Sequence, residues 1–306
     1  MFTELTDFTL ATQFLYAVAV PYFFALMGWE YFWIKFRKDR AGHSTSPFSG
    51  YTGYEKTDSA CSIAMGALKL VTMAAAGLYI IPIMYWLYDH RLFTLPFDSL
   101  WFLPLLIVVQ DFCYYWYHRC AHRSSFLWAE HSNHHTSETY NLSTALRQSL
   151  LGPFYAFVFF TPMALFGFEP LTIVFAQAFN LLYQYWIHTE TFEVKGWAEK
   201  VLNCPQHHRL HHAKNKVYHD CNYAGIFILW DRLFGSYRDY TNEIPVYGTV
   251  TPVLTKNPIK QGFAGWVMLI RKVKATPGLN DKLKRLVMPP DWEPEAASGQ
   301  PSPPLR

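Results

Sequence analysis

The chain has 306 residues, of which 51% are hydrophobic, 18% aromatic and only 16% charged, against roughly 25% charged residues in a typical soluble domain. This composition excludes a disordered chain, a collagen-like fibre and an ordinary cytosolic enzyme. The net charge of +3 is too small to indicate a nucleic-acid partner, and five scattered cysteines form neither a disulfide framework nor paired zinc motifs.

Apolar and charged residues are segregated along the sequence, as in an integral membrane protein. A helix needs about 20 apolar residues to cross a bilayer. Five apolar stretches therefore predict five transmembrane helices, with four as the alternative, because the last two stretches are short enough to form a re-entrant hairpin. The stretches are residues 8–29, 61–88, 99–117, 148–168 and 170–187.

The basic residues predict the orientation of these helices. Connections on one side are rich in Lys and Arg, whereas the opposite connections contain Arg91 alone. Because cytosolic connections carry the basic excess, the N-terminus is expected outside or in the lumen and the C-terminus in the cytosol. The membrane would be the endoplasmic reticulum in a eukaryote and the inner membrane in a bacterium.

The remaining segments complete an all-α membrane protein with a single integral membrane domain over residues 1–288. Residues 189–255 are polar and are expected to form a cytosolic cap over the helices. Residues 262–273 suit an amphipathic helix at the membrane interface. The proline-rich residues 289–306 are expected to be disordered.

The histidines are the unusual feature, because eleven of the thirteen lie between His118 and His219. Residues 118–122 form an HxxxH motif, and residues 131–135 and 208–212 each form HxxHH. On a helix these spacings place the imidazoles on one face. His188 follows at the cytosolic end of the fifth apolar stretch.

Imidazole binds iron, zinc and copper well, and nine candidates exceed the roughly four to six positions of one ion. Two neighbouring metals are therefore expected, and the scarcity of carboxylates argues against Mg²⁺ or Ca²⁺. His207 should project away from the cluster, and His219 lies further on. For His188 the alternative is a hydrogen bond to Asn222 or to a backbone carbonyl. The candidate ligands are His118, His122, His131, His134, His135, His188, His208, His211 and His212.

Charged residues inside the membrane are expected to be functional. Lys69 and Asp111 fall at nearly the same depth on helices of opposite direction, which predicts an ion pair. The alternative is that Lys69 extends alone toward the interface while Asp111 caps a neighbouring helix. Asn180 and Gln184 form a polar stripe that leads to His188, and this stripe must face other helices or a cavity.

Several polar residues near the histidines are expected to contact the metal ligands or a polar part of the substrate. Helix capping and contact with lipid headgroups are the alternative for Asn141 and Arg147, and helix-to-helix bonding is the alternative for the polar stripe. The candidates are Asp111, Asn141, Arg147, Asn180, Gln184, His207 and Asn222.

Five segments around these residues resemble the fatty acid hydroxylase/sterol desaturase superfamily. Within that superfamily the similarity is strongest to the alkylglycerol monooxygenases, and it spans residues 55–255. The segments are DFCYYWYHRCAH (111–122), HHTSETYNLSTALRQS (134–149), FNLLYQYWIHTE (179–190), HHRLHHAKN (207–215) and NYAGIFILWDRLFGSY (222–237).

The resemblance implies a membrane-bound, O₂-dependent, non-haem monooxygenase with two iron ions. The implied reaction is hydroxylation of a lipid from the bilayer, at the O-alkyl carbon of an alkylglycerol ether lipid, which yields an aldehyde and a glycerol derivative. The chain has no GxGxxG or GxxxxGK[ST] motif, so an external electron donor is expected. The donor is a cytochrome-type protein in much of the superfamily and tetrahydrobiopterin in the alkylglycerol enzymes.

Two other functions stay open at this stage. A sterol or fatty-acyl hydroxylase or desaturase would use the same metal site with a different cavity. A haem electron carrier or a metal transporter is the non-enzymatic alternative. Haem carriers pair histidines near the middle of the bilayer, whereas the histidines here are expected at its cytosolic face.

Overall fold

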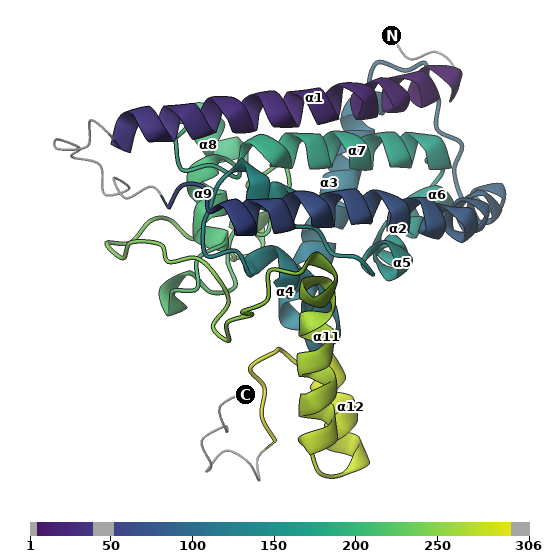
Figure 1. The fold of residues 1–306 in the computed structure, drawn as a ribbon. Helices are drawn as coiled ribbons and strands as arrows, with labels where there is room; N and C mark the ends of the chain where they lie inside the picture. Colours follow the sequence, from purple (N-terminus) through teal and green to yellow (C-terminus); the bar gives the residue numbers. More distant parts are fainter. Residues whose placement is uncertain (1–4, 39–51, 295–306) are drawn as a thin grey trace.

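The computed structural model describes residues 5–38 and 52–294, and this part of the chain is helical with no β-strand. An isolated antiparallel bridge joins Ala213 to Tyr247. Helices α1, α7 and α2 run side by side along the length of the molecule (Figure 1). The four longest elements of the bundle are α1 (Leu5–Lys38), α2 (Lys56–Asp89), α3 (Phe102–Arg123) and α7 (Pro170–Trp186).

Helices α1 and α2 are the two described helices long and apolar enough to cross a membrane. Each has 34 residues, and each presents large apolar side chains on its outer surface, such as Phe14, Val71 and Leu78. Side chains of this kind are stable on an outer surface when lipid surrounds them. The two helices are therefore candidate membrane spans, and the predicted total of four or five spans stays a prediction.

Residues 148–168 do not form the single helix that the sequence led us to expect. They form short helical turns instead, separated at Pro153 and Pro162, each of which lies in the first turn of a new segment. Proline lacks the N–H that would continue the preceding helix, so each one starts a new turn. The first and the last of these turns pack along α2, and the middle one packs on α3. The turns are α5 (Pro153–Ala156), η3 (Phe157–Phe159) and α6 (Thr161–Leu165).

The turn before α7 forms where the sequence predicts it. Gly167 adopts a φ of +99°, and a Cβ there would lie 2.3 Å from the carbonyl oxygen of Phe93, so glycine is required. The Glu169 side chain then accepts hydrogen bonds from the backbone N–H groups of Leu171 and Thr172, at 2.8 and 3.2 Å. This cap directs α7 back along α1.

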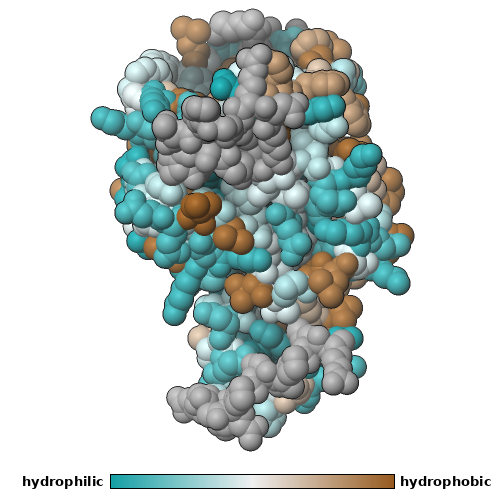
Figure 2. Space-filling view, turned by 60° about the vertical axis from the view of Figure 1, so that its left-hand side comes forward, coloured by the Kyte–Doolittle hydropathy of each residue, from teal (hydrophilic) through white to brown (hydrophobic). Residues whose placement is uncertain are grey.

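The polar cap contains short helices joined by irregular segments. Helices α8 and α9 lie at the end of the bundle where α1 and α7 end and α2 begins (Figure 1). Hydrophilic residues cover most of the described surface on that side (Figure 2). The short helices of the cap are α8 (Trp197–Val201), α9 (Pro205–His211), η4 (Lys216–Tyr218) and α10 (Leu229–Leu233). Between α3 and α7 in the sequence lie α4 (Ser125–His135) and η2 (Leu142–Leu146).

Two C-terminal helices, α11 (Pro258–Ala275) and α12 (Leu279–Val287), form a hairpin that projects from the bundle (Figure 1). Helix α11 includes the amphipathic segment expected at residues 262–273. At the start of the proline-rich tail, Arg285 donates hydrogen bonds to the carbonyl oxygen of Trp292 and to Glu293. Residues 295–306 lie outside the described part of the chain.

Candidate metal centre

The nine histidines proposed as ligands come together in two buried groups. Within each group the nitrogen atoms that could bind a metal all lie within 4.8 Å of one another. The first group contains His118, His122, His131, His135 and His211, and the second contains His134, His188, His208 and His212.

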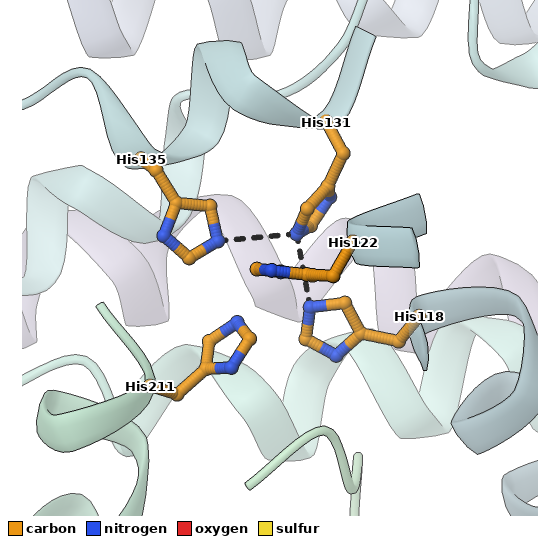
Figure 3. Close-up of side chains that lie close together, drawn as sticks. All are labelled: His118, His122, His131, His135 and His211. Atoms are coloured by element: carbon orange, nitrogen blue, oxygen red, sulfur yellow. Dashed lines mark hydrogen bonds between the residues drawn. The ribbon is translucent and has the colours of Figure 1, made fainter. Parts of the chain in front are cut away.

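The five rings of the first group converge from three helices (Figure 3). Helix α3 provides His118 and His122, α4 provides His131 and His135, and α9 provides His211. The Nε2 atom of His131 lies 2.9 Å from Nε2 of His118 and 3.2 Å from Nε2 of His135. Atoms about 2.1 Å from one ion, at right angles to each other, would be ~3.0 Å apart. The spacing therefore fits a shared metal.

The second group has the same spacing. The Nε2 atom of His188 lies 3.1 Å from Nε2 of His134 and 3.0 Å from Nε2 of His208. The Nε2 atoms of His208 and His212 are 3.2 Å apart. His188 is thus part of this group, and the ring follows directly after the C-terminal end of α7.

Each HxxHH motif is divided between the two groups. On α4, His131 and His135 face the first group while His134 faces the second. On α9 the division is reversed, because His211 faces the first group and His208 the second. Residues i and i+4 share a helical face, and the residue at i+3 lies beside it. Both helices therefore bridge the two groups and hold them next to each other.

Backbone carbonyl groups orient four of the rings. The Nδ1 atoms of His118 and His211 bond the carbonyl oxygens of Tyr223 and Cys221, at 2.7 and 2.8 Å. Those of His134 and His188 bond the carbonyl oxygens of Arg147 and Gln184, at 3.1 and 2.7 Å. Since a carbonyl oxygen only accepts, Nδ1 carries the proton and the Nε2 lone pair is directed into the group.

The chemistry of the donor set also fits a metal. Burial lowers the pKa of His134 to about 4 and that of His211 to about 3, so both rings are neutral, as metal binding requires. The buried Nε2 atoms of His122 and His211 have no hydrogen-bond partner among the described residues. An unpaired buried nitrogen is costly, and a bound cation would satisfy it.

His207 and His219 lie outside both groups, as the sequence predicts. The Nδ1 atom of His207 accepts a hydrogen bond from the backbone N–H of Cys204 at 3.3 Å. His207 also lines a polar surface cavity of about 380 Å³. The exposed His219 ring bonds the carbonyl oxygen of Lys214 at 2.8 Å.

The predicted ion pair between Lys69 and Asp111 is wrong. The Asp111 carboxylate instead accepts hydrogen bonds from the backbone N–H groups of Ile226 and Phe227, at 2.7 and 2.9 Å, and from the Trp230 indole at 3.0 Å. It therefore caps the turn that precedes α10, in agreement with the alternative interpretation.

The polar stripe of α7 reaches the candidate metal centre through its backbone. Asn180 donates to Asp111 at 2.8 Å and accepts from Gln184 at 2.5 Å. The carbonyl oxygen of Gln184 accepts from His188, and that of Arg147 accepts from His134. Asp111, Asn180 and Gln184 thus form one chain of hydrogen bonds that ends at His188. Arg147 contacts His134 separately.

Asn141 and Asn222 make contacts of another kind. The Asn141 side chain caps η2 and donates to the carbonyl oxygen of Gly53 at 2.7 Å. Asn222 donates to the carbonyl oxygens of His207 and Arg238, at 3.1 and 2.9 Å. Neither side chain bonds a histidine ring of the two groups in the described structure, so both stabilise the loops around the site.

Sequence reasoning missed three buried carboxylates that support the centre. Glu30 of α1 accepts from the backbone N–H of Leu142 at 2.8 Å and from the hydroxyl of Thr189, the residue after His188. Asp231 accepts from the backbone N–H of Tyr223 at 2.8 Å, and Tyr223 in turn holds His118. A charge within an apolar run was the available signal for Glu30.

The third carboxylate, Asp58, forms an ion pair with the buried Arg147 at 2.7 Å. Lys256, from the segment before α11, binds the same carboxylate at 2.6 Å. Because the Arg147 carbonyl holds His134, this three-charge network links α2 and the C-terminal segment to the second group. The network neutralises the charge of Arg147, which would be costly to bury alone.

Comparison with known proteins gives a family for the central part of the chain. A family model described as fatty acid hydroxylase matches residues 103–236, which include all nine histidines of the two groups. No solved structure gives a match to this chain.

Several curated proteins are similar over a longer range. An alkylglycerol monooxygenase of Homo sapiens is 42% identical over 238 residues, which cover 78% of this chain and 53% of that protein. One of Caenorhabditis elegans is 38% identical, covering 67% and 43%. A Delta(7)-sterol 5(6)-desaturase of Aspergillus fumigatus is 30% identical, covering 49% and 41%. The matched part of the chain spans about half the length of the two alkylglycerol monooxygenases. Residues 103–236 therefore match the fatty acid hydroxylase family, and most of the chain is similar to proteins named alkylglycerol monooxygenase.

Proposed function

We propose that this protein is a membrane-bound, O₂-dependent, non-haem di-iron monooxygenase that hydroxylates a lipid C–H bond. The proposed target is the O-alkyl carbon of an alkylglycerol ether lipid. The observation that carries the proposal is the pair of adjacent imidazole groups, one of five and one of four rings, within a fatty acid hydroxylase domain. The names of the alkylglycerol monooxygenase relatives support the ether-lipid substrate.

Two bound iron ions would supply the activation of O₂ that attack on an unactivated C–H bond needs, and that side chains cannot provide. In the overall reaction one oxygen atom enters the lipid and the other leaves as water, with two electrons and two protons supplied. A hydroxyl on the carbon beside the ether oxygen makes a hemiacetal. Its C–O bond then breaks to give an aldehyde and a glycerol derivative.

The residues around the centre orient the ligands and exclude water. Carbonyl groups hold His118 and His188, which are 1% and 2% exposed. The Tyr140 ring lies with its centroid 5.1 Å from that of His212, and the Tyr223 ring 5.2 Å from that of His122. These aromatic walls keep the site dry, which protects a reactive oxidant from loss to water.

The electrons come from an external donor in this proposal, with tetrahydrobiopterin or a cytochrome-type protein as the candidates. The metal centre and C-terminus face the cytosol, and the lipid enters from the bilayer. The arrangement of the rings argues against a haem carrier, because nine imidazoles converge in groups of five and four rather than in facing pairs.

Product analysis by lipid mass spectrometry tests the proposal. The iron-loaded protein is incubated with an alkylglycerol, a fatty acid and a sterol in parallel, with and without a tetrahydropterin. We expect loss of the alkylglycerol and formation of an aldehyde only with the pterin. A variant with both His135→Ala and His208→Ala, which removes one ring from each group, is the control.

Other products would change the assignment. Hydroxylated or desaturated acyl or sterol products would contradict the ether-lipid substrate. They would favour a sterol or fatty-acyl hydroxylase or desaturase, which the similarity to the sterol desaturase supports. A Soret band in the purified protein would contradict a non-haem centre. Equal turnover by the double variant would contradict the role of the two groups.

A further inference from the structure

We infer that the hairpin of α11 and α12 is a membrane-docking element. It would bind the anionic headgroup layer of the bilayer on the side of the metal centre and couple this contact to α4. The inference does not depend on which lipid is oxidised.

Both helices of the hairpin carry an exposed apolar stripe. On α12, Leu279, Leu283 and Val287 recur every four residues and are 74%, 55% and 70% exposed. A helix that keeps a stripe of this kind out of the protein core needs another apolar surface. The stripe on α11 consists of Ile259, Phe263, Val267 and Ile270, all exposed and on one helical face.

The charges beside these stripes are predominantly positive. Helix α11 contains no acidic residue, and α12 contains Asp281 alone. A second copy of the hairpin would meet like charges, whereas an anionic lipid layer attracts basic amphipathic helices. The exposed basic residues are Lys260, Arg271, Lys274 and Lys284.

The direction of the hairpin suits this role. Helices α11 and α12 run across the direction of α1 and α2, the two candidate membrane helices (Figure 1). When α1 and α2 cross the bilayer, the hairpin lies along its surface. Amphipathic helices at an interface adopt this orientation because the apolar face reaches the acyl boundary while the basic residues contact headgroups.

The hairpin is tightly joined to the helix that carries three candidate ligands. A Cβ on Gly265 of α11 would lie 2.0 Å from the carbonyl oxygen of Ala129 in α4, so the two backbones touch. Asn133 donates to the carbonyl oxygen of Gly262 at 2.9 Å. Gln261 adds a bond to Thr136 at 2.7 Å, and Trp266 adds one to Glu130. A force on the hairpin is therefore transmitted to α4.

Fluorescence quenching in lipid nanodiscs tests the docking. The full-length protein with Leu283→Cys is labelled with an environment-sensitive dye, and lipids bearing a nitroxide quencher are included. Leu254→Cys is the matched control, because Leu254 is 87% exposed and lies outside the hairpin. The parent protein, treated with the same dye, gives the background from labelling of the native cysteines. We expect strong lipid quenching at position 283, more in phosphatidylglycerol than in phosphatidylcholine discs, and little at position 254.

Charge reversal tests the lipid preference. The variant Lys274→Glu with Lys284→Glu should reduce the preference for anionic discs by at least roughly fivefold, with unchanged iron per chain. Lys195→Glu with Lys216→Glu, on the cap, should leave the preference unchanged. Equal access of an aqueous quencher to positions 283 and 254 would overturn the inference, as would hairpin-dependent dimers. Quenching is read without turnover, so this failure is distinguishable from failure of the proposed function.

Discussion

His188 shows how one side chain can be held by the backbone and also belong to a candidate metal-binding group. Its Nδ1 bonds the carbonyl oxygen of Gln184 at 2.7 Å, while its Nε2 lies 3.0 Å from Nε2 of His208. The backbone bond, which was the alternative to a ligand role, is instead compatible with it. Metal-binding histidines commonly donate their second N–H in this manner.

Replacing His188 by glutamine should remove about half of the bound iron and most turnover, because the group of four would lose a ring that contacts two others. His207→Gln is the matched control, since His207 is a neighbour in the sequence of His208 but points elsewhere. Iron per chain and product formation are measured for both. Full iron loading and activity in His188→Gln would remove His188 from the site.

At the scale of elements, Asp111 joins α3 to the turn before α10. Its carboxylate accepts from Ile226, Phe227, Asn180 and Trp230, all within 3.0 Å. Such a set leaves no oxygen of the carboxylate for a lysine partner. The bonds also place the loop that contains Tyr223, which holds His118 through its carbonyl oxygen.

The variant Asp111→Asn should lower the free energy of unfolding by about 2–4 kcal/mol, because an amide accepts with one oxygen and directs an NH₂ group at the remaining donors. Lys69→Met should have little effect on stability. In the double variant, the change in the free energy of unfolding should equal the sum of the two single changes within about 0.5 kcal/mol. Thermal unfolding in detergent measures all three. A larger coupling energy between positions 69 and 111 would support an ion pair between Lys69 and Asp111 after all.

The contact between α4 and α11 makes a second prediction at this scale. Gly265→Ala should destabilise the protein by about 1–3 kcal/mol, because its methyl group would collide with the backbone at Ala129. Gly77→Ala, on α2, is the control, since nothing lies within 4 Å of its added Cβ. The apparent Tm is measured for both variants. Equal Tm values for Gly265→Ala and Gly77→Ala would mean that α11 is free to move on α4.

In the whole molecule, the two imidazole groups connect segments that lie far apart in the sequence. Helices α3, α4 and α9 and the end of α7 all contribute rings. A metal that binds only the folded state stabilises it by mass action. The groups are therefore expected to act as cross-links between the membrane helices and the cap.

Removal of the metals by a chelator should lower the apparent Tm and increase amide hydrogen exchange most in α4 and α9. Helix α1, which contributes no ring, should change least because it is held by α7. Exchange measured by mass spectrometry before and after chelation checks this pattern. Readdition of iron should restore protection, and a uniform change along the chain would contradict the cross-linking role.

The sequence by itself determined the helical class, the long apolar helices and the histidines that come together. Each follows from a local pattern, because helical periodicity places residues 131–135 and 208–212 on single faces and apolar length indicates a membrane span. The turn at residues 167–170 was likewise visible from its own glycine and proline.

The tertiary structure alone decided which rings share a group and which partners the buried charges have. The hydrogen-bond donors to the Glu30 carboxylate are Tyr54, Leu142 and Thr189, which are distant from it in the sequence. The division into five and four rings depends on how α3, α4 and α9 meet. Contacts of this kind arise from the packing of several elements at once, so no local pattern in the chain encodes them.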